Sequence, residues 1–344
     1  MKIAICSSFV PFVHGGYRNI VEWLAKALRG AGHQVEIVYL PQSEEADQLF
    51  THMAAYRLVD LDAADVVVCF RPQAHLVRHR RKVVWFIHHI RQYYDLWDTE
   101  YRGLPDTPKY RGIRSALQEL DTQALREAHT IFSNSAVMAQ RLMTFNSLAS
   151  EVLFPPVDEP GRFRHGPTGD EIVCICRMEH HKRQHLLVEG LAHTTTDVRL
   201  RLMGRSGSSA FVDNLRELAL RLGVDKRVLI DDRWISEEEK IDLLAGCLAS
   251  AYVPFDEDSY GYPTLEAAHA SKPTLTTIDS GGVTEFVRDG IEGLVCAPEA
   301  EKIGAAMDKL FLDKKTSLSM GRAAHDRIAE LKISWAHVIE RLLA

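Results

Sequence analysis

The 344-residue sequence predicts two doubly wound α/β domains, each built on a parallel sheet between layers of helices. Short apolar runs recur between longer amphipathic stretches, and the runs are nearly continuous in Val and Ile, as in strands that are buried on both faces. The alternation breaks once, at the polar segment 157–170, and then restarts. We therefore place the two domains at residues 1–160 and 161–329.

The first domain is predicted to be a parallel sheet that starts with a β–α–β unit. Its expected strands are residues 2–8, 34–40, 65–70, 82–89, 130–135 and 151–156. Between the first two strands, Ile20, Val21 and Leu24 share one face of a helix, and Gly30 marks its end.

The second domain repeats the pattern. Its expected strands are residues 171–178, 199–204, 227–232, 249–255, 273–279 and 293–297. Ser236 and Glu239 form a predicted capping box at the start of one intervening helix. Two such halves are expected to leave a cleft between them, with the binding residues in loops that follow the strands.

Composition excludes several classes of protein. Lys and Arg total 41 against 47 Asp and Glu, so no overall basic field points to nucleic acid. The longest apolar runs are far shorter than the ~20 residues of a membrane helix. The start of the chain reads as a strand with no cleavable signal, and the six cysteines show no CxxC framework, so we expect a cytoplasmic protein.

Two loops of the first half carry candidate binding residues. Gly15 and Gly16 precede the first helix, where a ligand could approach the backbone, although a plain turn explains them equally well. His88 and His89 end a strand, and only one of them can point into the cleft because strand side chains alternate. A solvated or core histidine is the alternative.

The second half carries candidate anion-binding residues. Arg177 and Lys182 lie before a helix, and two cations there suit a diphosphate, whereas a solvated loop is the alternative. Gly204 lies in a glycine-bearing turn after a strand. His181 and His185 have metal-ligand spacing but lack the Glu of a hydrolytic zinc helix, so we expect no metal.

Residues 255–273, "FDEDSYGYPTLEAAHASKP", predict a loop followed by a helix that starts after Gly261. The backbone N–H groups of Tyr262, Thr264 and Leu265 are expected to be unpaired and to form an anion site. Asp258 and Glu266 flank this site, and carboxylates beside a phosphate are better suited to sugar hydroxyls than to the phosphate itself.

Three segments, "RMEHHK", "SYGYPTLEA" and "DSGGVTEFVRDGIEGLV", together resemble the retaining glycosyltransferases of family 4, which have the GT-B fold. The resemblance extends to "HGG", "FIHH" and "PPVDEPGRF". It also includes the terminal "SWAHVIERLLA", which is similar to the family's helix that crosses back onto the first domain; we expect this helix over residues 330–344.

The resemblance implies roles for matching positions. Arg177 and Lys182 resemble the pair that binds the donor diphosphate, and Asp258 and Glu266 the ends of the family's E-x7-E motif, which contact the transferred sugar and the ribose. His88 resembles the strand-end histidine beside that sugar. The expected catalytic residues are Arg177, Lys182 and His88, and the expected donor-binding residues are Gly15, Gly16, Arg177, Lys182, Gly204, Arg233, Asp258, Tyr260, Gly261, Tyr262, Thr264, Leu265 and Glu266.

The sequence departs from the family at several of these positions. Asp258 is one methylene shorter than the usual Glu, which bears on the contact with the donor sugar. Cys176 stands where a glycine usually precedes the arginine, and the glycines of "GRSG" are spaced one residue wider than usual.

The expected function is therefore retaining transfer of a sugar from a UDP- or GDP-sugar to an acceptor hydroxyl, with no cofactor and no obligatory metal. The acceptor is expected to be a sugar, a small molecule or a lipid-linked glycan. Basic stretches at 78–86 and 109–114 leave open a weak contact with an anionic lipid surface, although exposed strand flanks explain them more simply. The oligomeric state is open.

Two other functions stay open. Asp258 raises the hypothesis of a sugar-nucleotide-binding protein without transfer activity. An NAD-linked oxidoreductase is less favoured, because no GxGxxG follows the first strand with an acidic residue at the usual distance.

Overall fold

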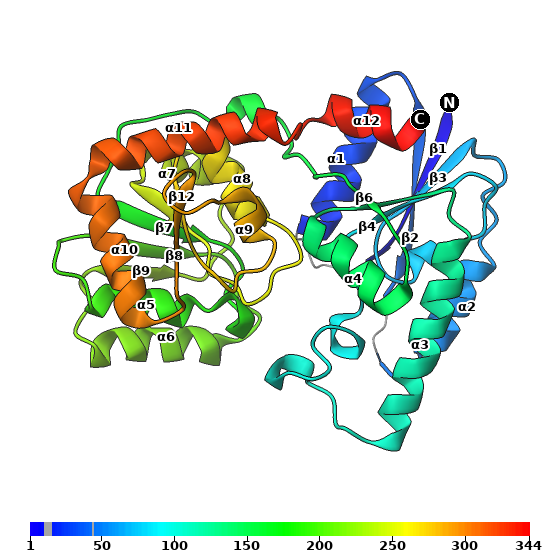
Figure 1. Cartoon of the computed structure of the whole chain (residues 1–344), viewed down its shortest axis with the longest axis horizontal. Coiled ribbons are helices and arrows are strands. Elements are labelled where there is room, and N and C mark those ends of the chain that lie inside the picture. The colour runs from blue at the N-terminus through cyan, green and yellow to red at the C-terminus, as the bar shows by residue number, and fades with distance from the viewer. Residues whose placement is uncertain (10–15, 43–44) are drawn as a thin grey trace. The chain divides into compact units, whose positions relative to one another are not determined.

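The computed structural model describes residues 1–9, 16–42 and 45–344. The chain forms two compact units, one of residues 1–156 with 333–344 and one of residues 157–332 (Figure 1). Each unit contains a six-stranded parallel sheet flanked by helices, so the predicted fold class is confirmed.

In unit 1 the strands pair in the order β2-β1-β3-β4-β5-β6. Its elements are β1 (Lys2–Phe9), α1 (Gly16–Gly30), β2 (Gln34–Pro41), α2 (Leu49–Arg57), β3 (Val66–Cys69), η1 (Ala74–Leu76), β4 (Lys82–Phe86), η2 (Arg91–Tyr93), η3 (Glu100–Arg102), α3 (Pro108–Arg126), β5 (Thr130–Ser133), α4 (Ala136–Asn146), β6 (Glu151–Val152) and α12 (Trp335–Leu343).

Both faces of this sheet are covered, which explains why its strands are continuously apolar. Ala4 and Cys6 of β1 join the core beneath α2, α3 and α4. Ile3 and Ile5 point to the other face, where α1 and α12 supply the partners. Val338 of α12 is fully buried there, so α12 completes the core of unit 1. Figure 1 shows α12 beside α1.

In unit 2 the order is β12-β11-β10-β7-β8-β9. Its elements are η4 (Pro160–Arg162), β7 (Glu171–Ile175), η5 (His180–Lys182), α5 (Gln184–Ala192), β8 (Arg199–Met203), α6 (Ser209–Arg221), β9 (Val228–Asp231), α7 (Glu237–Gly246), β10 (Ala249–Ala251), α8 (Tyr262–His269), β11 (Thr274–Thr277), α9 (Val283–Phe286), β12 (Gly293–Cys296), α10 (Ala300–Leu312) and α11 (Lys314–Glu330).

The strand β7 divides the core of unit 2. Ile172 and Cys174 pack with α5, α6 and α10 on one face. Val173 packs on the other face with Leu244 of α7 and Ala267 of α8. The alternation places α7 and α8 together beside the loops that follow β7 and β10.

Several strands are shorter than predicted. The run 151–156 yields only the two residues of β6, because Pro155 and Pro156 have no N–H to donate to a ladder. The run 249–255 yields only Ala249–Ala251, after which the chain leaves the sheet as a loop.

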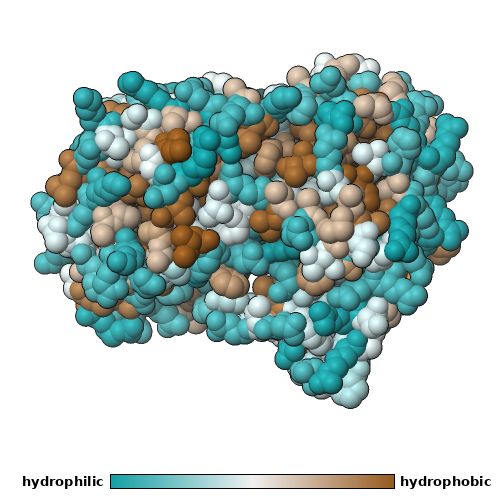
Figure 2. Space-filling model, in the orientation of Figure 1, coloured by the Kyte–Doolittle hydropathy of each residue, from teal (hydrophilic) through white to brown (hydrophobic). Residues whose placement is uncertain are grey.

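The face shown in Figure 2 is largely hydrophilic, with apolar side chains in separate groups. Within residues 1–9, 16–42 and 45–344, no helix combines the length and the apolar character that crossing a membrane requires.

Candidate functional site

The residues predicted from the second half of the sequence lie at the carboxyl edge of the unit 2 sheet. Arg177 comes two residues after β7, and Lys182 ends η5. Gly204 directly follows β8, and Arg233 follows β9. Because β10, β7, β8 and β9 are successive neighbours in the sheet, the loops that carry these residues are also neighbours.

Lys182 is buried between the loops after β7 and β10. Its side chain is 9% exposed, and its Nζ forms an ion pair with the carboxylate of Glu257. The same Nζ donates to the Tyr252 hydroxyl at 2.9 Å. Burial, reinforced by the Glu257 carboxylate, raises the pKa of Tyr252 far above its usual value, so the phenol stays protonated. The ammonium is therefore held by two side chains of the loop that follows β10.

Arg177, in contrast, presents its guanidinium at the surface. Its side chain is 53% exposed, and Nη1 donates to Glu179 at 2.6 Å. Its carbonyl accepts from Gln184 Nε2 at 2.9 Å, which fixes the backbone. An exposed ion pair is weak, so this guanidinium can exchange its partner for another anion.

Gly204 joins the loops after β7 and β8. Its φ is +135°, and a Cβ at this position would overlap the carbonyl oxygen of Cys176. Its N–H donates to the carbonyl of Asp231 at 3.1 Å. Only glycine allows the backbone to approach the Cys176 carbonyl this closely, so Gly204 packs directly against the segment that carries Arg177.

Arg233 is exposed and has two carboxylate partners. It donates to Asp231 and Glu239, in each case through a bond of 2.9 Å. Hydrogen bonding to Glu239 is the main cause that raises its pKa. Ser236 Oγ accepts from the Glu239 N–H at 3.1 Å, so half of the predicted capping box is present, but the Glu239 carboxylate binds Arg233.

The start of α8 corrects one prediction. The N–H groups of Thr264 and Leu265 both donate to the carbonyl of Gly261, at 3.1 and 3.4 Å. They are therefore not unpaired, as the sequence suggested, because Gly261 is the N-cap and its carbonyl begins the helical hydrogen bonds. Among the three predicted amides, only that of Tyr262, the first helical residue, precedes this pattern.

Gly261 itself is explained by packing. Its φ is +70°, and a Cβ would overlap the ring of Tyr252. The N-terminus of α8 therefore lies directly against the tyrosine that binds Lys182. Thr264 is fully buried, and its Oγ1 has no hydrogen-bond partner in the portion of the chain that the structure describes.

Glu266 points into the interior beside α7. Its carboxylate is 2.6 Å from Nζ of Lys240. Burial raises the pKa of Glu266, and the Lys240 ammonium opposes this effect. The carboxylate of Glu266, the expected ligand of the ribose, is therefore paired with the Lys240 ammonium.

The other two loop residues differ in burial. Asp258 is half-buried. Tyr260 is 1% exposed, and its ring packs edge-on against Phe286 at 5.9 Å between centroids. The structure places the Tyr260 ring in the interior, where it supports the loop.

The candidate residues of unit 1 that the structure describes are His88 and His89, which follow β4, and Gly16, which begins α1. His88 is half-buried; its Nδ1 donates to the carbonyl of His89 at 2.7 Å, and its Nε2 accepts from Arg71 Nε at 3.4 Å. His89 is buried and stacks on Tyr94 with ring centroids 4.0 Å apart. Gly16 is the exposed first residue of α1, and Gly15 lies outside the described residues.

Four important residues were missed by the sequence analysis: Tyr252, Glu257, Lys240 and Glu179. Glu257 belongs to an acidic run, 256–258, in which the motif spacing drew attention to Asp258 alone. Tyr252 lies in an apolar run that reads as a strand. Only the fold brings Tyr252 and Glu257 to Lys182, and Lys240 to Glu266.

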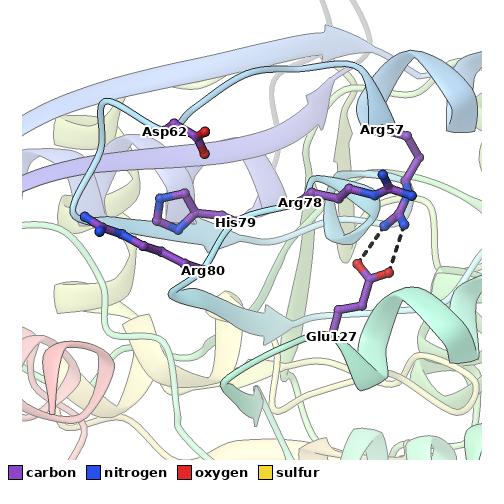
Figure 3. A pocket seen from close by; sticks show the side chains of 6 residues that line it. All are labelled: Arg57, Asp62, Arg78, His79, Arg80 and Glu127. Atoms are coloured by element: carbon purple, nitrogen blue, oxygen red, sulfur yellow. Dashed lines mark hydrogen bonds and ion pairs between the residues drawn. The ribbon is translucent and has the colours of Figure 1, made fainter.

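A separate hollow of about 400 Å³ lies at the amino ends of the unit 1 strands, away from the carboxyl ends that carry the candidate residues (Figure 3). Its lining is Arg57, Asp62, Arg78, His79, Arg80 and Glu127. Arg57 donates to both oxygens of Glu127, at 2.6 and 2.8 Å. Lys82, from the same basic stretch, is buried and donates to backbone carbonyls. None of the predicted site residues lines this hollow.

The histidines of η5 and α5 pack on each other. The rings of His180 and His185 stack at 6.0 Å. Over the described ranges, no cluster of three or more His, Cys, Asp or Glu residues has the arrangement of a metal site.

The comparisons with known proteins agree with this geometry. Residues 159–327 match the sequence model of the family described as glycosyl transferases group 1. The alpha-1,3/1,6-mannosyltransferase ALG2 of Mus musculus is 33% identical over 98 residues, which are 28% of this chain and 23% of that protein. The D-inositol 3-phosphate glycosyltransferase of Corynebacterium aurimucosum is 26% identical over 264 residues, which are 70% and 61% of the two chains. The chain thus spans about a quarter to three fifths of the length of these two curated relatives.

Solved structures resemble almost the whole chain. Sucrose-phosphate synthase of Thermosynechococcus elongatus superposes with a TM-score of 0.78 at 15% identity, covering 98% of this chain and 97% of that one. HepE of Anabaena in complex with UDP superposes with a TM-score of 0.75 at 16% identity, covering 100% and 98%. The chain is therefore a protein of the GT-B fold whose second unit carries the sequence pattern of the glycosyl transferases of group 1.

Proposed function

We propose that the protein is a retaining glycosyltransferase that moves a sugar from a UDP- or GDP-sugar to an acceptor hydroxyl without a metal ion. The observation that carries the proposal is the Lys182 ammonium, which is held at the carboxyl edge of the unit 2 sheet beside the N-terminus of α8. The match to glycosyl transferases group 1 covers this same unit and supports the assignment.

In the proposed reaction the donor diphosphate binds Lys182 and Arg177. Negative charge develops on the diphosphate as the bond to the sugar breaks, and two cations beside a helix N-terminus stabilise it. These groups take the place that a divalent cation has in other folds. Removal of one such partner from a preorganised site costs about 10²–10³ in turnover.

The carboxylates have separate roles. Glu266 accepts hydrogen bonds from the ribose hydroxyls, and Asp258 contacts the transferred sugar. The leaving phosphate takes the proton of the acceptor hydroxyl, because no base of this chain is assigned to that step. His88 is kept as a proposed catalytic residue because of its resemblance to the family's strand-end histidine.

The names of relatives support transfer of a hexose. The mouse relative is named a mannosyltransferase, and the bacterial one a glycosyltransferase of D-inositol 3-phosphate. HepE was solved with UDP and also with UDP-glucose. We therefore keep both UDP and GDP as donor nucleotides, and a sugar, a small molecule or a lipid-linked glycan as acceptor.

Two measurements test the proposal. Thermal unfolding with UDP, GDP and ADP should show stabilisation by UDP or GDP, since a ligand at a hundred times its Kd adds about 2.7 kcal/mol. UDP-glucose or GDP-mannose should then release nucleoside diphosphate, with the same rate in EDTA. Failure of every nucleoside diphosphate to stabilise the protein contradicts the proposal, and loss of turnover in EDTA contradicts its metal-free form.

A sugar-nucleotide-binding protein without transfer activity is the second candidate. The observation that favours it is Asp258, whose carboxylate is one methylene shorter than the usual Glu. Stabilisation by UDP-glucose without release of UDP, in the presence of a panel of sugar and polyol acceptors, would support this alternative.

A further inference from the structure

The two cations of the proposed diphosphate site already have carboxylate partners. Arg177 pairs with Glu179 at the surface, where an ion pair contributes little and exchanges freely. The pair of Lys182 with Glu257 is different, because the two side chains are only 9% and 18% exposed. A phosphate that approaches Lys182 meets a buried carboxylate at the same ammonium.

The backbone that carries Glu257 is fixed on both sides. The carbonyl of Glu257 accepts from Gly282 N–H at 2.9 Å, and a Cβ at Gly281 would overlap the backbone of Glu257. The preceding residue, Asp256, donates its N–H to the carbonyl of Asp279 at 2.9 Å. These contacts tether the loop, so rotation of the Glu257 side chain is the simplest way for its carboxylate to leave Lys182.

The ammonium has few donors to share. Of its three N–H groups, one binds the Tyr252 hydroxyl and one the Glu257 carboxylate. A nucleoside diphosphate brings further negative charge into this partly buried space, where repulsion between like charges is stronger than in water. A phosphate and the Glu257 carboxylate at the same ammonium therefore repel each other, so each weakens the interaction of the other with Lys182.

We propose that Glu257 is a positioning residue that competes with the donor diphosphate for Lys182. Its carboxylate holds the ammonium in place before the donor binds, rotates away when phosphate takes its position, and returns as the nucleoside diphosphate leaves. Glu257 thereby weakens the binding of the product and favours its release. This inference rests on the proposed function, because it needs a diphosphate at Lys182.

The test is a double-mutant cycle on nucleotide affinity. UDP and GDP are titrated by calorimetry into the wild type, E257Q, K182A and the double variant E257Q/K182A. Glutamine has nearly the same shape as glutamate and keeps an acceptor for Lys182 but no charge. E257Q should bind the nucleotide about tenfold more tightly than the wild type. The gain should disappear in the K182A background, because the competition is for that ammonium.

The amino end of β7, the strand that precedes Lys182, provides a matched control variant. Glu171, the first residue of β7, pairs with Arg201 at 2.7 Å and is also partly buried. E171Q removes a comparable ion pair and should leave the nucleotide affinity unchanged. Thermal unfolding of each variant establishes that it is folded, and E257A serves as the second variant if E257Q is not.

The outcomes separate this inference from the proposed function. Equal or weaker nucleotide binding by E257Q overturns the inference, since a purely structural carboxylate would give that result. The same gain in the absence of Lys182 also overturns it, since the effect would then be one of overall charge. If the wild type binds neither UDP nor GDP, the proposed function fails first, and the inference fails with it.

Discussion

Nζ of Lys240 lies 2.6 Å from Oε1 of Glu266, in an ion pair whose side chains are 12% and 7% exposed. Removal of one partner from a buried pair leaves an uncompensated charge. We therefore predict that K240M lowers the free energy of unfolding by about 3 kcal/mol at neutral pH. Urea unfolding of the wild type and the variant measures this difference.

The pH dependence of that loss is a further part of the same prediction. Without Lys240, burial raises the folded-state pKa of Glu266 further above its unfolded value, so the folded protein binds the extra proton. Stability of K240M relative to the wild type should then fall as pH rises above the ordinary pKa of a glutamate. The double variant K240M/E266Q has no ionisable group at position 266 and should show no such trend. If the free energy of unfolding of K240M is lowered equally at all pH values, packing and not charge is the cause.

The sequence pattern predicted the strands and the helix around Lys182 and Glu266, but not the side chains that form ion pairs with these two residues. Periodicity identifies β7, β10 and α8 because each has its own apolar pattern. Motif spacing identifies Lys182, Asp258 and Glu266. Neither type of signal can locate a side chain from another loop. The ion-pair partners of Lys182 and Glu266 therefore follow only from the order of the strands in the sheet.

The prediction of three free amides failed for a related reason. Sequence placed the start of the helix after Gly261 but could not show that the Gly261 carbonyl accepts from both Thr264 and Leu265. The predicted start of the helix is correct, so the error lies in the first turn itself. With Gly261 as the N-cap, Leu265 is the first residue whose amide has an acceptor in the helix, and a tighter bond from Thr264 to the same carbonyl pairs a second amide.

Gly204 should tolerate no side chain. Its φ of +135° and its contact with the Cys176 carbonyl mean that G204A combines backbone strain with overlap. We expect a loss of about 2–4 kcal/mol in the free energy of unfolding. Gly207, in the same loop, has open space where a Cβ would lie and no such φ, so G207A is the matched control. Equal effects of the two substitutions on the urea midpoint would contradict this explanation.

His269 should make the protein sensitive to acid. Burial, followed by the nearby His325, lowers the pKa of His269 to about 4, and its ring stacks on Phe163 at 5.8 Å. An unfolded histidine takes up a proton near pH 6.5, so the unfolded state binds more protons between pH 6.5 and about 4. Stability contributed by neutral His269 is present above this window and is lost as pH falls through it.

The variant H269F keeps an aromatic ring against Phe163 and removes the titration. Between about pH 7 and about pH 4.5 it should lose less stability than the wild type, by an amount on the order of 2 kcal/mol. H129Q, which changes an exposed histidine of unit 1, should retain the wild-type pH profile. Parallel unfolding curves for H269F and the wild type at both pH values would show that His269 is not the group responsible.

Substitutions of Arg177 and Lys182 should have similar effects on turnover but different effects on the free energy of unfolding. Both R177A and K182A should lower turnover of the sugar nucleotide about 10²–10³-fold. Only K182A should also lower the free energy of unfolding, by about 3 kcal/mol, because it leaves the Glu257 carboxylate buried without its cation. R177A changes an exposed side chain and should stay within about 0.5 kcal/mol of the wild type.

The exposed pair offers its own control. E179Q removes the carboxylate partner of Arg177 but leaves the guanidinium in place. If Arg177 acts through its charge on the diphosphate, E179Q should keep at least the wild-type turnover while R177A loses it. Steady-state release of nucleoside diphosphate from UDP-glucose or GDP-mannose measures both. Near-native turnover in R177A would remove Arg177 from the proposed mechanism, and equal losses in R177A and E179Q would show that the pair supports the loop and does not bind the donor.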